Sequence, residues 1–289
     1  MSNTTPPEFI ERKVWCASAA GLHAMAYTEW GDRDNPQVLI CVHGLTRNGR
    51  DFDDLARAMS GDYRVICPDV VGRGQSDWLR DPAYYGIKNY VQDMVTLIAR
   101  LDVGAVHWLG TSMGGVIGMV LASLENTPIT RLMLNDVGPE ISPDAIRRIG
   151  EFLGRPPLFA TLDEAERFIR LVSAPFGLLS DAQWRRLTET SLHQRPDGTL
   201  EMRYDPRIAE SFQRATASSE LGLWPIYDRI RCPTQVLRGE KSDLLSLDTV
   251  QAMAARGPRA EVVEVPGVGH APMFMDVSQI NLVKAFFTP

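Results

Sequence analysis

A five-residue segment, Gly110 to Gly114 with the sequence GTSMG, constrains this chain more than any other. The apolar run at 105–109 before it is typical of a buried strand, and the residues from 115 to 120 favour a helix. A Gly-x-Ser-x-Gly turn between a strand and a helix lifts a serine hydroxyl out of the backbone, beside the helix N-terminus. The segment therefore predicts a strand–turn–helix unit that presents Ser112 as a nucleophile.

Short apolar strands alternate with helical patterns along much of the chain. Strands are expected at 22–28, 38–42, 63–67, 131–134, 234–239 and 261–265, and helices at 50–60 and 90–101. This alternation predicts a parallel sheet with helices on its faces. Functional groups in such a sheet gather at the carboxyl ends of the strands.

A serine nucleophile needs a base, and His270 is the candidate. It lies in the Gly-rich loop 266–272, directly after the predicted strand 261–265. A histidine in a flexible loop past a strand can reach the edge of the sheet where Ser112 lies. Of the five histidines in the chain, His43 begins another loop and is expected to be structural.

Two carboxylates compete for the position that orients the imidazole. Asp243 follows the predicted strand 234–239, and Asp136 follows the strand 131–134. Both satisfy the chain order serine, acid, histidine. We expect Asp243 to hold His270 in one tautomer and to stabilise the imidazolium. The alternative for Asp136 is a strand-end carboxylate that accepts a backbone N–H.

Two backbone N–H groups complete the predicted site. The residue after the nucleophile, Met113, supplies one of them. The other comes from the loop that starts His43-Gly44-Leu45 after the buried strand 38–42, and we expect it from Leu45. These groups would bind the oxyanion of a tetrahedral intermediate, and Gly44 would let the backbone approach closely.

These motifs together resemble the α/β-hydrolase superfamily. They are His43-Gly44, the stretch 69–76, the turn at Ser112, the stretch 239–243 and Gly269-His270, and the resemblance spans roughly residues 22–288. It implies an α/β fold with an eight-stranded, mostly parallel sheet and a helical cap inserted after the sixth strand. The motifs are similar to those of serine-dependent members such as carboxylesterases, enol-lactonases, carbon–carbon bond hydrolases and perhydrolases.

The serine at the turn between strand and helix limits which reactions are possible. Dehalogenases and cap-type epoxide hydrolases of this superfamily carry an aspartate there and form an ester on it, which Ser112 cannot do. The resemblance therefore implies acyl transfer, with Ser112 attacking and His270 acting as base and then acid. We expect hydrolysis of carboxylic esters through an acyl-enzyme. Three alternatives stay open. The same serine, histidine and aspartate could cleave lactones or carbon–carbon bonds, or transfer the acyl group to peroxide or an alcohol. They could also survive in a protein whose role is binding.

The stretch from 139 to 225 interrupts the strand–helix alternation. It favours helices at 144–153, 162–172, 181–192 and 206–213. We interpret it as a cap domain over a core domain of residues 1–138 and 226–289. Because a cap encloses a site, we expect small to medium, mostly apolar substrates. The candidate apolar lining comprises Ile146, Phe152, Leu153, Leu158, Phe159, Phe168, Phe176, Leu178, Met113 and Met273.

Composition excludes several classes of partner. The net charge of the 289-residue chain is −6, and it contains no block of Lys and Arg, so nucleic acid and anionic membrane are not expected. No apolar run reaches spanning length, and the N-terminus lacks a secretory pattern. Four cysteines without metal-ligand spacing predict a reduced, cytoplasmic protein with no metal and no cofactor. The expected partner is a small-molecule ester.

Overall fold

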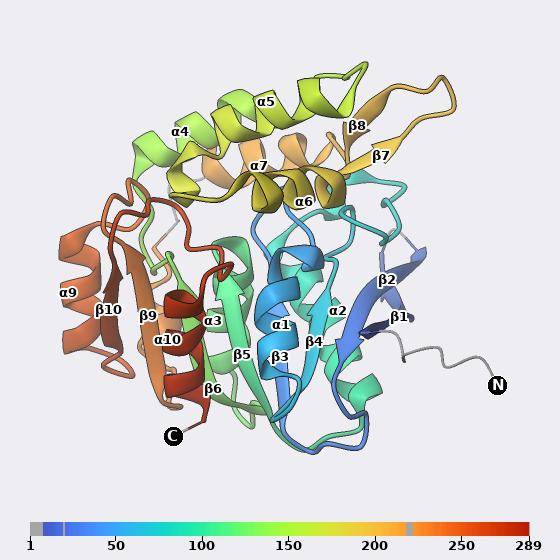
Figure 1. The fold of residues 1–289 in the computed structure, drawn as a ribbon. Helices are drawn as coiled ribbons and strands as arrows, with labels where there is room; N and C mark the ends of the chain where they lie inside the picture. Colours follow the sequence, from blue (N-terminus) through green and yellow to red (C-terminus); the bar gives the residue numbers. More distant parts are fainter. Residues whose placement is uncertain (1–7, 20, 218–221, 289) are drawn as a thin grey trace.

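A computed structural model of the chain describes residues 8–19, 21–217 and 222–288. Its main feature is an eight-stranded sheet in the order β1-β2-β4-β3-β5-β6-β9-β10. The pairs β1–β2 and β2–β4 are antiparallel, and the other neighbours are parallel, which confirms the predicted fold class (Figure 1). The strands are β1 (Phe9–Ser18), β2 (Gly21–Trp30), β3 (Val38–Val42), β4 (Arg64–Pro68), β5 (Val106–Thr111), β6 (Ile129–Asn135), β9 (Thr234–Gly239) and β10 (Glu261–Val265).

The sheet has a buried core on each face, because successive side chains of a strand point to opposite sides. In β3, Val38, Ile40 and Val42 pack on the side of α2 (Ile87–Leu101) and α3 (Met113–Ala122). Leu39 and Cys41 pack on the other side, with α1 (Asp53–Met59) and α10 (Val277–Phe287). Since both faces of the central strands are covered, these strands are apolar throughout, as parallel sheets require.

A layer of helices and one ribbon lies above the carboxyl ends of the strands (Figure 1). It comprises α4 (Pro143–Phe152), α5 (Leu162–Val172), α6 (Asp181–Ser191), the ribbon β7 (Leu192–Gln194) with β8 (Leu200–Met202), and α7 (Ile208–Ala217). The chain then returns through α8 (Trp224–Tyr227) to β9, and α9 (Leu247–Ala255) follows that strand. Short 3-10 helices occur at Gly49–Phe52, Pro82–Tyr84 and Ala174–Phe176.

The observed elements follow most of the predicted ones. All four helices expected between 139 and 225 are present within a few residues, and the strands 38–42, 234–239 and 261–265 have the predicted bounds. The β7–β8 ribbon was not predicted, because its strands are only three residues long. The division of the chain into domains at 139 and 225 stays a prediction.

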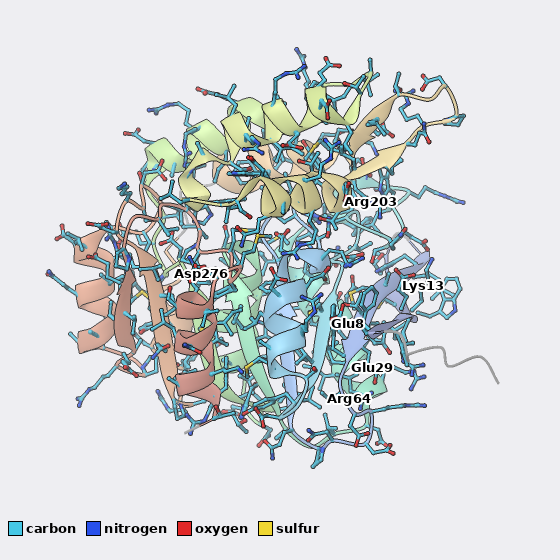
Figure 2. All side chains as sticks on the ribbon, in the orientation of Figure 1. Glu8, Lys13, Glu29, Arg64, Arg203 and Asp276 are labelled. Atoms are coloured by element: carbon cyan, nitrogen blue, oxygen red, sulfur yellow. The ribbon has the colours of Figure 1, made fainter. Side chains whose placement is uncertain are left out.

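Charged side chains are buried at the end of the sheet opposite the helical layer. The Glu29 carboxylate on β2 accepts from Arg64 Nε on β4 at 2.7 Å and also from Arg12 on β1. Figure 2 shows Glu29 and Arg64 side by side low in the molecule. A buried carboxylate with two guanidinium partners has its hydrogen bonds satisfied, so the antiparallel edge β1-β2-β4 is fixed in register.

Among the described residues, no helix has the length and apolar character needed to cross a membrane.

Close packing of α3 against the sheet depends on glycine. A Cβ atom at Gly114 would lie 2.0 Å from the Val42 carbonyl oxygen, which is backbone and cannot turn aside. We expect Gly114→Ala to lower the free energy of unfolding by about 1–3 kcal/mol or more, because overpacking usually costs this much. Urea unfolding measures this. Gly104→Ala is the matched control, since a Cβ there meets no atom within 4 Å. Equal stability of the two variants would contradict this packing.

Candidate active site

The predicted turn holds Ser112 between β5 and α3. Its backbone has φ 52° and ψ −116°, a conformation that non-glycine residues rarely adopt. The neighbouring glycines provide space rather than freedom of φ, because a Cβ at Gly110 would lie 2.2 Å from the Gly114 carbonyl oxygen. Ser112 is the N-cap residue of α3, so its side chain lies beside the first N–H groups of that helix.

His270 lies in the loop after β10 and lines the same cavity as Ser112. Its ring Nδ1 is 2.8 Å from Asp136 Oδ2, so Nδ1–H donates to the carboxylate and Nε2 is left for another partner. No hydrogen bond joins the Ser112 hydroxyl to the imidazole in the described part of the chain. In structures without substrate, catalytic hydrogen bonds are commonly long and tighten only on binding.

The carboxylate that contacts His270 is Asp136, not Asp243. Asp136 follows β6 and is fully buried, and its Oδ1 accepts the Gly239 N–H at 2.8 Å. Its Oδ2 accepts the Ser242 hydroxyl at 2.6 Å in addition to the His270 ring. Three donors, from the end of β9 and from the loops after β9 and β10, therefore fix this carboxylate in one position.

The expected contact of Asp243 with His270 is wrong. The Asp243 carboxylate is about half exposed and pairs with Arg148 on α4 at 2.7 Å. The loop after β9 instead turns the preceding residue, Ser242, inward. Both aspartates obey the required chain order, so the sequence could not decide between them. Which strand end faces the imidazole depends on the loop conformation.

The loop after β3 brings Leu45 to the cavity. Gly44 lies against Ser112, since a Cβ there would be 3.7 Å from Ser112 Cβ. Leu45 lines the cavity, and Met113 is the first residue of α3, whose N–H has no partner within its own helix. The N–H groups of Leu45 and Met113 thus remain the candidates for the oxyanion hole.

Two buried side chains brace this loop. His43 Nε2 accepts the Val70 N–H at 2.9 Å, and its Nδ1 donates to the Gly44 carbonyl at 2.7 Å. Complete burial lowers the pKa of His43 to about 3, so the ring stays neutral. Arg73 is fully buried, and its Nε donates to the Leu45 carbonyl at 2.8 Å.

Arg73 makes further contacts around the same point. One terminal nitrogen donates to the Val71 carbonyl and the Tyr90 hydroxyl, and the other lies 3.6 Å from Met113 Sδ. No described carboxylate forms an ion pair with it. The motif at 69–76 contains Arg73, but nothing in its sequence indicated contact with both candidate oxyanion-hole residues.

The cavity above Ser112 has a volume of about 240 Å³ and is mostly apolar. This volume lies just below the range of ligand pockets, roughly 300–1,000 Å³, and favours a small substrate. Of the apolar candidates from the sequence, the cavity lining includes Leu153, Phe168, Phe176 and Met273. Ile146, Leu158, Phe159, Leu178 and Met113 lie outside that lining, and the side chain of Phe152 lies outside the described residues.

Comparison with known proteins identifies the family of this chain. Residues 39–279 match the model of the Alpha/beta hydrolase family. The chain belongs to the α/β-hydrolase family. A 3-hydroxybutyrate-oligomer hydrolase of Cupriavidus necator is 52% identical over 95% of this chain and 96% of its own.

Solved structures also resemble this α/β hydrolase over nearly their whole length. An alpha/beta hydrolase from Novosphingobium aromaticivorans has a TM-score of 0.87 and 36% identity, covering 97% of this chain and 98% of its own. A structure from Rickettsia typhi has a TM-score of 0.88 and 32% identity, covering 96% and 97%. The family match and the names of these relatives identify the protein as a hydrolase.

One group of potential metal ligands lies elsewhere in this α/β hydrolase. Ligand atoms of Cys16, His23 and Asp93 lie within 4.8 Å of one another, and all three residues are buried. His23 Nε2 is 3.0 Å from Asp93 Oδ2, and burial raises the pKa of the Cys16 thiol to about 12. These contacts join β1 and β2 to α2. The sequence spacing gave no sign of this cluster.

Substitution distinguishes the roles of Asp136 and Asp243. We expect Asp136→Asn to lower kcat on a neutral aryl ester by on the order of 10³- to 10⁴-fold, because the neutral amide can turn its NH2 group toward Nδ1, which disfavours the Nδ1–H tautomer, and it no longer stabilises the imidazolium. Asp243→Asn should stay within about threefold of the unchanged enzyme, as exposed ion pairs contribute little. Circular dichroism confirms folding of both variants. The opposite ranking would restore Asp243 to the role first predicted.

Arg73 can be tested on the same neutral ester. Arg73→Met removes the donor that holds the Leu45 carbonyl, so we expect kcat to fall by roughly 10- to 100-fold, below the full loss of an oxyanion donor. KM should change little, because the side chain lies beneath the cavity rather than in it. Arg73→Lys keeps the charge and should retain an intermediate kcat. A rise in KM at unchanged kcat would count against positioning by Arg73.

Proposed function

We propose that this protein hydrolyses short oligoesters of small hydroxy acids, including 3-hydroxybutyrate oligomers, through an acyl-enzyme on Ser112. The observation that carries the proposal is the shared cavity of Ser112 and His270, with the His270 Nδ1–H bound to buried Asp136. The 52% identity to a 3-hydroxybutyrate-oligomer hydrolase over nearly both whole chains supports the substrate class.

In the first half of the proposed reaction, the Ser112 hydroxyl oxygen attacks the ester carbonyl carbon. His270 Nε2 takes the hydroxyl proton, and the buried Asp136 carboxylate stabilises the imidazolium. The N–H groups of Leu45 and Met113 bind the oxyanion. The intermediate collapses when the carbon–oxygen bond of the leaving hydroxy acid breaks and His270 protonates that oxygen.

In the second half, water replaces the alcohol. His270 removes a proton from water as the water oxygen attacks the acyl-enzyme carbonyl. A second tetrahedral intermediate then releases the hydroxy acid and returns the proton to Ser112. The mostly apolar cavity suits the methyl-bearing chain of the substrate, and its small volume favours short oligomers over polymer segments.

The nucleophile is tested by turnover of the 3-hydroxybutyrate dimer. We expect Ser112→Ala to reduce kcat by at least about 10³-fold at unchanged folding stability, the scale of loss seen for serine nucleophiles. Ser123→Ala, at the other end of α3, is the matched control and should retain activity. A fluorophosphonate probe should label Ser112 in the unchanged protein. Comparable turnover by both variants would refute the acyl-enzyme on Ser112.

The same assay separates the remaining chemistries. An aryl ester, a lactone and a vinylogous diketone are offered beside the dimer, and hydrogen peroxide or methanol is added as a competing acceptor. The proposal expects the dimer to have the highest kcat/KM and water to be the acceptor. A single stoichiometric burst without further turnover would favour a binding protein.

A further inference from the structure

Five titratable side chains line the cavity: His270, Arg47, Asp51, Arg148 and Tyr204. Arg47 and Asp51 neutralise each other, through Nε–Oδ2 and terminal nitrogen–Oδ1 contacts of 2.9 and 2.5 Å. The second terminal nitrogen of Arg47 donates to the Ser191 hydroxyl at 2.9 Å. With all three nitrogens of Arg47 engaged, this pair presents little net charge to a substrate.

Arg148 is in a different position. It reaches the cavity from α4, but its partner Asp243 lies in the loop after β9 and is not among the lining residues. One terminal nitrogen makes both contacts with Asp243, at 2.7 and 2.9 Å. Arg148 Nε is buried and has no hydrogen-bond partner among the described residues. The guanidinium therefore has unused donors.

The pair of Arg148 and Asp243 is also easy to rearrange. The two side chains are 40% and 52% exposed, so solvent screens their attraction and the pair contributes little to stability. A planar guanidinium binds a carboxylate best through two parallel N–H groups, which the contact with Asp243 does not use. A ligand carboxylate could therefore share or replace Asp243 at small cost.

We propose that Arg148 binds the terminal carboxylate of the oligoester, so that the enzyme acts on free acids at their carboxyl end. This inference rests on the proposed function. In a chain of hydroxy acids, the acyl side of any ester bond ends in a hydroxyl group and the leaving-group side ends in a carboxylate. A carboxylate anchored at Arg148 therefore belongs to the leaving group. The side of the cavity at α4 is the leaving-group side.

The test compares the 3-hydroxybutyrate dimer as free acid with its methyl ester. The methyl ester lacks the terminal charge but carries a second ester bond, so initial-rate product analysis counts only cleavage of the bond between the two units. In the unchanged enzyme, kcat/KM should be higher for the free acid. Arg148→Met should lower kcat/KM for the free acid by about 10- to 100-fold, the scale of a lost charge-assisted hydrogen bond, mainly through KM. The methyl ester should lose far less, so the preference for the acid disappears.

Three further variants sharpen the comparison. Arg147→Met is the matched control, because Arg147 lies on the same helix, pairs with Asp144 and does not line the cavity. Arg148→Lys keeps the charge without the fork and should retain part of the preference. Asp243→Asn removes the competing carboxylate and should leave the preference equal or greater.

Other results would overturn either the carboxylate proposal or the proposed substrate class. If Arg148→Met and Asp243→Asn reduce turnover of both substrates equally, the pair only holds α4 against the β9 loop and the carboxylate proposal is overturned. It is also overturned if the unchanged enzyme cleaves acid and methyl ester equally well. In both cases cleavage of the dimer continues, so the proposed function stands. If neither dimer is cleaved while simple aryl esters are, the proposed substrate class fails.

Discussion

The hydrogen bond between His270 Nδ1 and the buried Asp136 carboxylate organises the candidate site. Three segments far apart in the sequence meet at this carboxylate: the end of β6, the loop after β9 and the loop after β10. A fully buried carboxylate is unfavourable unless its oxygens accept hydrogen bonds. Gly239, Ser242 and His270 supply them, so the same contacts that stabilise the carboxylate also fix the tautomer of the imidazole.

The opposite side of the site depends on close approach of backbone. Gly114 lies against the Val42 carbonyl, and Gly44 lies against Ser112. This brings the loop after β3 and the start of α3 together beside the strained turn. Buried Arg73 then links the Leu45 carbonyl to the Met113 side chain. Polar groups beneath the cavity are thus held by one another, which allows the cavity itself to remain mostly apolar.

The helical layer above the sheet decides what can enter. Its residues contribute much of the apolar lining, and α4 contributes Arg148, whose buried Nε has no hydrogen-bond partner among the described residues. A small, mostly apolar cavity with Arg148 at one side matches the proposed short ester with a terminal carboxylate better than a polymer. Arg148 and Asp243 also join this layer to the β9 loop, so substrate recognition and contact between the layers involve the same side chains.

The sequence by itself determined the fold class, the turn at Ser112, the loop that carries His270 and the helices between 139 and 225, because each is a local pattern of apolar spacing, glycine or chain order. Tertiary structure alone decided which aspartate contacts His270, since Asp136 and Asp243 both follow strands at the same sheet edge. It also decided the contacts of Arg73 and Arg148 and the short β7–β8 ribbon. These depend on how loops turn and which side chains face inward, and such choices leave no periodic signal in the chain.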